Sequence, residues 1–206
     1  MPDTLTVKLT RKYYDDKIFF RKASVEFEQG ITVLVGCNGY GKTTMLNSIA
    51  AHCRVNKIPC IEFDSIRNRR NDRDRTTLDG DMGFLATFFC SSEGEQISLS
   101  VGKFARKLGD FIRKNSDKDE LVVLFDALDS GYSIDNIVEV KEFLTDTVMR
   151  DCAGGGKLYI IISANSYELV SGERCIDPIK CEPVSFNNYE QYRKYILNTR
   201  KIKDKR

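Results

Sequence analysis

The stretch LVGCNGYGKTT, residues 34–44, decides the fold of this 206-residue chain. Within it, Gly36–Thr43 fits the pattern G-x-x-x-x-G-K-[ST] of a phosphate-binding loop. Glycines let backbone N–H groups converge on phosphate oxygens, and the N-terminus of a following helix adds partial positive charge. We expect Lys42 to reach the β- and γ-phosphates of a nucleoside triphosphate such as ATP, and the Thr43 hydroxyl to bind Mg²⁺.

The residues on either side supply the context that such a loop needs. ITVLVG, residues 31–36, is an almost continuous apolar run with β-branched residues, typical of a strand buried on both faces. After the loop, Met45, Leu46, Ile49 and Ala50 fall on one face of a helix. A buried strand before the glycines and a helix after them favour a nucleotide site over a turn that merely connects two elements.

Strands and helices alternate along the rest of the chain. Apolar patterns predict strands near 4–10, 24–30, 58–63, 121–126 and 158–163, a small β addition at 175–186, and helices at 97–112, 133–149 and 188–201. This alternation predicts an α/β fold with a mainly parallel central sheet plus a small antiparallel β part. The length favours one domain spanning residues 1–206.

Composition limits the classes of protein that fit. Hydrophobic residues make up 41% and charged residues 30%, a profile typical of soluble globular proteins. The net charge of +2 provides no global basic field for nucleic acid. No apolar run is long enough to span a membrane, and the N-terminus lacks the apolar core of a secretory signal. The seven scattered cysteines contain no C-x-x-C pair and favour reduced thiols, so we expect a cytoplasmic location.

Two further segments carry side chains that a phosphate loop needs. LVVLFD, residues 121–126, is a buried strand that delivers Asp126 at its end, where a carboxylate can hold Mg²⁺. In SSEGEQ, residues 91–96, Ser92 is followed three residues later by Glu95, which is a capping box at the start of an amphipathic helix.

Together these segments resemble ABC-type ATPases, including the SMC and RecF-type heads. The resemblance is carried by GCNGYGKTT with its Asn38-Gly39 pair, by SSEGEQ, by LFDALDSGYSIDN and by SANSYE, and it spans nearly the whole chain. In its overall likeness the chain resembles the small stand-alone AAA/ABC-type ATPases encoded by bacteriophages and their bacterial relatives. This implies a cytoplasmic location, in the host cytoplasm if the chain is phage-encoded. The resemblance implies that ATP·Mg²⁺ is bound by Asn38, Gly39, Gly41, Lys42, Thr43, Thr44 and Asp126.

The resemblance also implies a homodimer that sandwiches two nucleotides. Ser92, Gly94 and Glu95 would then bind the γ-phosphate of the ATP held by the other subunit. In this family the turn that binds the other subunit's γ-phosphate is called the signature motif, and SSEGEQ is our candidate for it. LSVGK, residues 99–103, also resembles that motif, but helical periodicity places it in the middle of a helix, where the backbone N–H groups are already hydrogen-bonded. The family's adenine platform would be Tyr14, with Tyr13 as the alternative.

Two family landmarks are absent from this chain. Ala127 stands where the family has the Glu that acts as catalytic base. Ala164, flanked by Ser163 and Asn165, stands where the family has a histidine, called the switch His, that helps to align the attacking water. General-base catalysis contributes roughly 10²–10⁴ to a rate, so we expect slow hydrolysis. Asp129 is the nearest spare carboxylate that could act as a base, and Asn165 could orient a water.

Three functions fit these observations. The first is a weak ABC-type ATPase that dimerises around ATP. The second is a nucleotide-gated interaction module that does not hydrolyse ATP and acts with a nucleic-acid-processing or other partner protein. The third is a P-loop kinase, whose arginine-rich lid could only be residues 67–75; the Asn38-Gly39 pair counts against it. The basic C-terminus, residues 200–206, could contact the phosphates of a nucleic acid or could simply be solvated.

Overall fold

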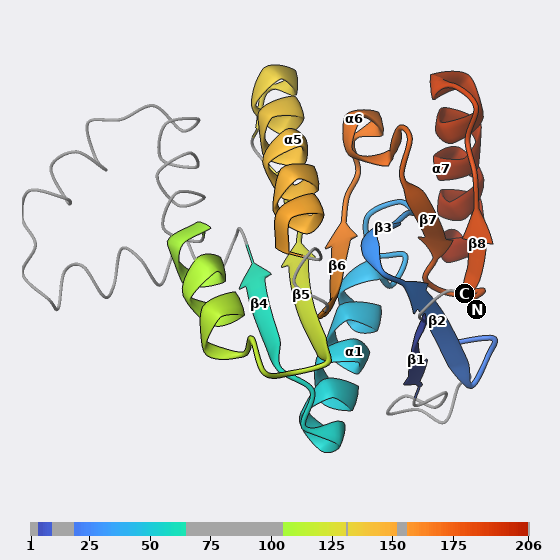
Figure 1. Cartoon of the computed structure of the whole chain (residues 1–206). Helices are drawn as coiled ribbons and strands as arrows, with labels where there is room; N and C mark the ends of the chain where they lie inside the picture. Colours follow the sequence, from blue (N-terminus) through green and yellow to red (C-terminus); the bar gives the residue numbers. More distant parts are fainter. Residues whose placement is uncertain (1–3, 10–18, 65–104, 131, 152–155, 206) are drawn as a thin grey trace, which may run out of the picture.

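The computed structural model describes residues 4–9, 19–64, 105–130, 132–151 and 156–205. Its centre is a six-stranded sheet in the order β4-β5-β6-β3-β7-β8 (Figure 1). The strands are β3 (Gly30–Leu34), β4 (Cys60–Asp64), β5 (Glu120–Asp126), β6 (Lys157–Ser163), β7 (Arg174–Asp177) and β8 (Glu182–Val184). All neighbours pair in parallel except β7 and β8, which are antiparallel.

A second, two-stranded sheet lies beside the central one. It is formed by β1 (Thr4–Lys8) and β2 (Ser24–Glu28), which pair antiparallel with Leu5 opposite Phe27 and Val7 opposite Val25. These four side chains are buried and alternate with outward-facing residues, as the period of two in a half-buried strand requires. The predicted fold class, a mainly parallel sheet plus a small antiparallel part, is confirmed.

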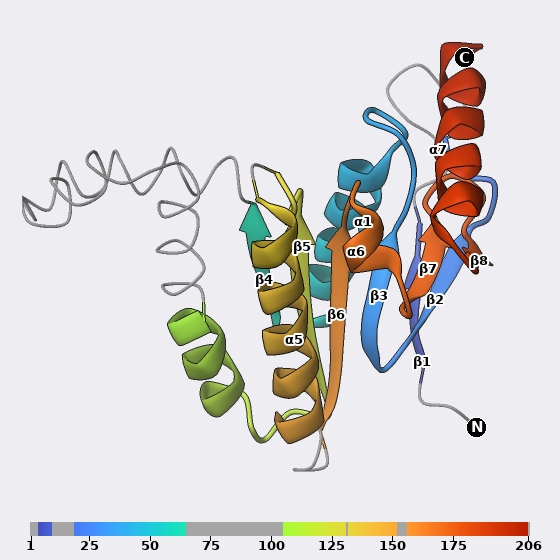
Figure 2. The ribbon, with the colours of Figure 1, turned by 90° about the horizontal axis from the view of Figure 1, so that it is seen from above.

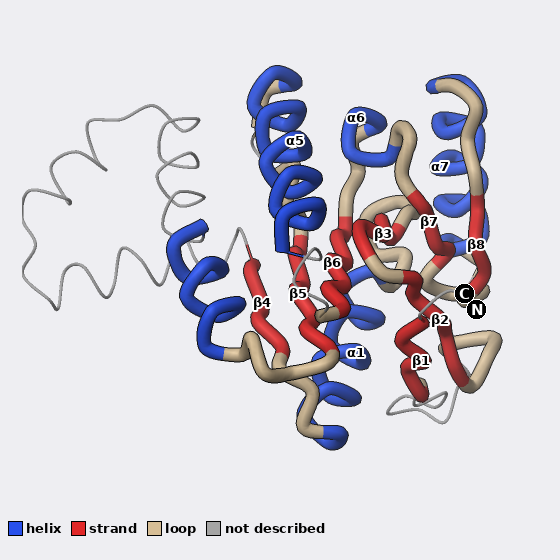
Figure 3. Tube along the Cα trace, viewed as in Figure 1, coloured by secondary structure: helices blue, strands red, loops and turns tan. Residues whose placement is uncertain are grey.

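Four labelled helices accompany the sheets: α1 (Lys42–Asn56), α5 (Ile134–Asp151), the short α6 (Tyr167–Val170) and α7 (Tyr189–Asp204). A further helix covers residues 105–114. Figure 2 shows α1 on one face of the central sheet and α5 on the other, and Figure 3 separates the helices from the strands by colour. Among the described residues, no helix combines the length and the apolar character needed to cross a membrane.

Each face of the central sheet has its own hydrophobic core. Along β5, Val123 and Phe125 pack into the core on the α5 side, whereas Val122 and Leu124 pack into the core on the α1 side. The predicted apolar face of α1 lies in the second of these cores. Because both faces are covered, β3, β5 and β6 read as continuous apolar runs rather than alternating ones.

Parallel pairing brings three strand ends to one edge of the sheet. β6 lies between β3 and β5, with Phe125 of β5 opposite Ile162 of β6. The segments that follow β3, β5 and β6 therefore emerge side by side. In open α/β sheets, ligands bind at the carboxyl ends of the strands, so this edge is where a site is expected.

Candidate nucleotide-binding site

The loop between β3 and α1 has a backbone that requires glycine at its two ends. Gly36 has φ 154°, and a Cβ there would overlap the ring of Tyr40. Gly41, the N-cap of α1, has φ 103°, and a Cβ there would lie 2.7 Å from Cζ of Phe19. The loop therefore depends on glycine both for its dihedral angles and for its close packing.

Lys42, the first residue of α1, extends back along the loop. Its side chain is buried, and its Nζ donates to the carbonyl oxygens of Gly36 (2.6 Å) and Cys37 (3.3 Å) and to Oδ1 of Asn165 (2.8 Å). Burial lowers the pKa of Lys42, while Asp129, Cys37 and Asp126 act in the opposite direction. The ammonium thus lies between the loop and the turn after β6, as expected for a lysine that binds phosphate.

The other predicted loop residues lie around this lysine. Asn38 and Gly39 are exposed at the tip of the loop, and Thr43 is exposed in the first turn of α1. Thr44 is half-buried, and its carbonyl oxygen accepts a hydrogen bond from Ser48 within the helix. The Thr43 hydroxyl is therefore accessible at the helix N-terminus, where an anion is favoured.

Asp126 lies at the end of β5 and is half-buried. Its Oδ1 accepts a hydrogen bond of 2.5 Å from the hydroxyl of Ser163, and the same hydroxyl oxygen accepts from the N–H of Ala127 at 2.8 Å. A carboxylate and a threonine hydroxyl are hard oxygen ligands of the kind that Mg²⁺ prefers, and Mg²⁺ is usually held by one or two carboxylates together with substrate phosphates. Asp126 and Thr43 therefore fit a Mg²⁺ that arrives with a nucleotide.

The structure distinguishes the two residues after β6. Ala164 is fully buried and packs in the core on the α5 side. Asn165 is exposed and accepts a hydrogen bond from Lys42. Hence it is Asn165, the first residue beyond the strand with a polar and accessible side chain, that contacts the site from this turn.

Asp129 holds that turn in place. Its Oδ2 accepts hydrogen bonds from the backbone N–H groups of Asn165 and Ser166, both at 2.6 Å. Its Oδ1 is buried and has no hydrogen-bond partner among the residues that the structure describes. The carboxylate expected from the sequence as a candidate base is therefore committed, through one oxygen, to positioning the residue that contacts Lys42.

The site thus brings together residues predicted in three separate motifs. Lys42, Asp126 and Asp129 lie at one edge of the sheet, and Asn165 is hydrogen-bonded to both Lys42 and Asp129. The predicted signature residues Ser92, Gly94 and Glu95 and the predicted adenine platform, Tyr14 or Tyr13, lie outside the described residues, as does the segment 67–75. Sequence reasoning did not assign the contacts that α7 makes with the loop, because they follow no motif.

Comparisons with known proteins agree with this architecture. The profile of a family described as an AAA domain matches residues 11–59, which is less than half of the chain. A search of curated protein sequences finds no match. Among solved structures, cbiO1 from Clostridium perfringens, part of the ABC transporter complex cbiONQ, is similar at a TM-score of 0.52 and 14% identity, with 98% of each chain covered.

A nucleotide-free ATP-binding cassette from an ABC transporter is similar at a TM-score of 0.53 and 11% identity, with 96% of each chain covered. At these identities the likeness shows the fold. The chain therefore has the fold of an ABC-type ATPase head, and this fold is consistent with nucleotide binding.

Proposed function

We propose that this protein binds ATP·Mg²⁺ at the carboxyl edge of its central sheet. The observation that carries the proposal is the position of Lys42, whose ammonium lies against the phosphate loop while Asp126 ends a strand at the same edge. Lys42 would bind the β- and γ-phosphates, and Thr43 and Asp126 would hold Mg²⁺, which neutralises phosphate charge. Asn38, Gly39, Gly41 and Thr44 would surround the phosphates.

The proposal extends to a dimer. Two copies of one domain, residues 1–206, would sandwich two nucleotides, each completed by Ser92, Gly94 and Glu95 of the other copy, with Tyr14 against adenine. The ABC-type fold and the order of the motifs along the chain support this arrangement. The resemblance to phage-encoded ATPases supports a role in a host cytoplasm, with a further partner protein.

Hydrolysis in this proposal is slow. Ala127 has no carboxylate, and one oxygen of Asp129 is engaged by two backbone N–H groups. Neither residue is therefore placed as a ready general base for an attacking water.

The first test of the proposal is binding and mass in solution. Titration calorimetry should detect ATP·Mg²⁺ binding that Lys42→Met removes. Light scattering with ATP·Mg²⁺, with ADP and without nucleotide should show a dimer with ATP alone, and Ser92→Arg should prevent it. A chain that stays monomeric under all three conditions, or a Ser92→Arg variant that still dimerises, would contradict the sandwich.

A second candidate function is a nucleotide-gated interaction module that does not hydrolyse ATP, and Ala127 favours it. Its test is Ala127→Glu, with Ala127→Gln as the control of equal size that lacks a base. Ala127 has φ 53°, and because alanine already carries a Cβ, glutamate adds no further backbone strain. If only the base is missing, turnover should rise roughly 10²–10⁴-fold in the glutamate variant alone. Rapid native turnover that is lost in Asp129→Asn would instead make Asp129 catalytic and overturn this second candidate.

A further inference from the structure

The C-terminal helix α7 contacts the two backbone segments that supply the acceptors of Lys42, the phosphate loop at Cys37 and the turn at Asn165. Thr199, buried on α7, accepts a hydrogen bond from the N–H of Cys37 at 3.0 Å and donates its own proton to the carbonyl of Ile196 at 2.7 Å. Two turns earlier, the hydroxyl of Tyr192 donates to the carbonyl oxygen of Asn165 at 2.5 Å. One helix, distant in sequence from the phosphate loop, therefore binds the backbone on both sides of the lysine.

The contact with Cys37 controls a single peptide group. The N–H that Thr199 accepts and the Gly36 carbonyl oxygen that Lys42 binds belong to the same planar peptide between residues 36 and 37. In a trans peptide these two groups point in opposite directions, so fixing one of them fixes the other. The orientation of this peptide is set by ψ of Gly36 and φ of Cys37. Because glycine lacks a Cβ, its own dihedral angles restrict that orientation less than those of other residues, and a hydrogen bond from outside the loop helps to fix it.

Two further contacts on the same face of α7 support this constraint. Tyr195 donates to Oδ2 of the buried Asp177 at 2.8 Å, and Tyr40 of the loop donates to the same oxygen at 3.3 Å. One turn beyond Thr199, Nζ of Lys203 reaches the carbonyl oxygen of Asn38 at 3.4 Å. Burial and the nearby Asp177 raise the pKa of Tyr195, so this hydroxyl remains a donor.

We propose that Thr199 is a positioning residue of the nucleotide site. Its hydroxyl orients the peptide between Gly36 and Cys37, and thereby also the Gly36 carbonyl oxygen that accepts a hydrogen bond from Lys42. In this role α7 is part of the phosphate-binding machinery although none of its residues need touch the nucleotide. The expected effect of Thr199 on nucleotide affinity rests on the proposed ATP binding. The expected effect of Thr199 on the conformation of the loop does not depend on ATP.

The test compares Thr199→Val, which keeps the shape and removes the hydroxyl, with Thr199→Ser, which keeps the hydroxyl. Thr147→Val is the matched control, because Thr147 is a buried threonine of α5 whose hydroxyl donates to Phe143 within its own helix. Thr199→Val leaves the buried Cys37 N–H without its acceptor, so affinity for ATP and ADP should fall about tenfold by calorimetry. Thr199→Ser should restore affinity to within about twofold, and Thr147→Val should leave it unchanged.

A second readout, amide hydrogen exchange without nucleotide, separates this inference from the proposed function. In Thr199→Val, exchange in residues 36–42 should accelerate about tenfold relative to β5 and β6, while Thr199→Ser and Thr147→Val resemble the native protein. Unchanged loop exchange in Thr199→Val, or a serine variant that behaves like the valine variant, would overturn the role of Thr199. A native protein that binds neither ATP nor ADP would overturn the proposed function, and the exchange measurement would still decide whether Thr199 positions the loop.

Discussion

At the level of single residues, Gly36 is a position where the phosphate loop has no room for a side chain. Its φ of 154° and the adjacent Tyr40 ring leave no room for a methyl group. Gly36→Ala should lower the free energy of unfolding by about 2–4 kcal/mol, from backbone strain and overpacking together. Urea denaturation measures this loss.

Gly109→Ala provides the comparison. Gly109 lies in the helix at residues 105–114, and a Cβ there meets nothing within 4 Å. That variant should gain about 0.5–1 kcal/mol, because alanine favours a helix more than glycine does. Equal effects of the two substitutions would show that the loop conformation is not tightly constrained.

If the protein binds ATP as proposed, Lys42 should make the affinity for ATP depend on pH. Burial lowers its pKa, so the ammonium of the free protein loses its proton at a lower pH than an ordinary lysine. The phosphates of ATP favour the protonated form, and affinity should therefore be greatest below the pKa of Lys42 and decline as pH rises through it. Calorimetry from neutral to alkaline pH checks the decline. Lys42→Arg, which keeps its charge at these pH values, should bind with an affinity that does not decline in this way.

Two substitutions of Asp129 test whether this residue supports the turn after β6. Asp129→Ala removes the acceptor of two backbone N–H groups and should lower the free energy of unfolding by about 1–3 kcal/mol. Asp129→Asn retains a carbonyl oxygen as acceptor and should lose less. Thermal or urea unfolding of both variants tests this order, and an alanine variant as stable as the native protein would show that the turn does not need Asp129.

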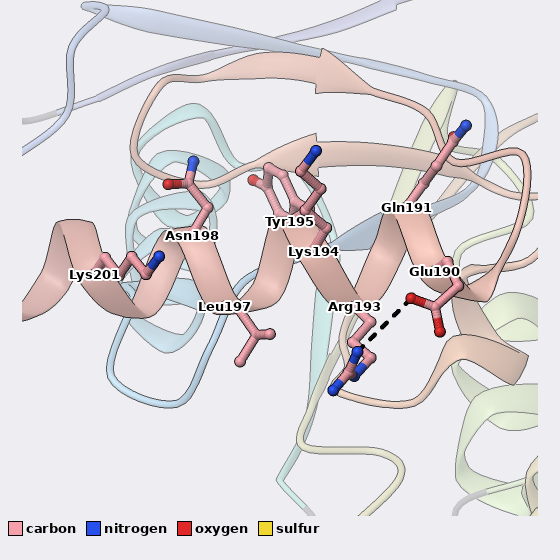
Figure 4. Close-up of a pocket in the computed structure, with 8 residues that line it drawn as sticks. All are labelled: Glu190, Gln191, Arg193, Lys194, Tyr195, Leu197, Asn198 and Lys201. Carbon is pink, nitrogen blue, oxygen red and sulfur yellow. Dashed lines mark ion pairs between the residues drawn. The ribbon is translucent and has the colours of Figure 1, made fainter.

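At the level of helices and strands, α7 begins with a cap that can be removed without changing a residue of the candidate nucleotide site. Oδ1 of Asn188 accepts from the N–H of Gln191 at 3.0 Å, and Oε1 of Gln191 accepts from the N–H of Asn187 at 2.9 Å. Figure 4 shows the outer face of the helix, where Arg193 pairs with Glu190 at 3.7 Å. Such an exposed pair contributes little, so the cap is the stronger device at this end.

Asn188→Ala should therefore lower the free energy of unfolding by about 1 kcal/mol. Asn187→Ala is the neighbouring control. The bond at Asn187 is made by its backbone, so this variant should remain within about 0.5 kcal/mol of the native protein. Urea denaturation distinguishes them, and equal stabilities would remove the capping role.

The pairing of β5 with β6 is the second element-scale feature that shapes the site. Phe125 opposite Ile162 places Asp126 beside Ser163, so the two strand ends share one hydroxyl. A one-residue shift of β5 against β6 would turn the side chains of the shifted strand to the other face of the sheet, and Asp126 would no longer lie beside Ser163. The carboxylate of Asp126 is thus positioned by strand pairing as much as by its own sequence context.

At the scale of the whole molecule, the proposed dimer predicts how stability responds to concentration. A ligand at 100 times its Kd stabilises the protein that binds it by about 2.7 kcal/mol, so ATP·Mg²⁺ should raise Tm. If ATP also joins two copies, Tm in ATP should increase with protein concentration, whereas Tm in ADP should not. Thermal scans over a wide range of protein concentrations check this, and a Tm in ATP that is independent of concentration would favour a monomeric binder.

The features that depend on neighbouring residues could be predicted from the sequence alone. The phosphate loop, the buried face of α1, the apolar runs of β3, β5 and β6 and the parallel character of the sheet all follow from motifs and short periodicities. Lys42 and Asp126 could be nominated as candidates in the same way, because each belongs to a local pattern, Lys42 to the glycine loop that precedes a helix and Asp126 to the end of an apolar strand.

The contacts between distant residues at the candidate site follow from the folded chain and not from any local pattern. The family resemblance put Ala164 at the switch position and named Asn165 and Asp129 as candidates for a water-orienting residue and a base. The structure buries Ala164, presents Asn165 to Lys42 and has Asp129 hold that turn. The contact of Thr199 with Cys37 joins positions 162 residues apart and leaves no periodic trace in the sequence. Local patterns report the propensity of a segment, whereas hydrogen bonds between segments depend on strand order and helix docking, which follow from packing of the whole chain.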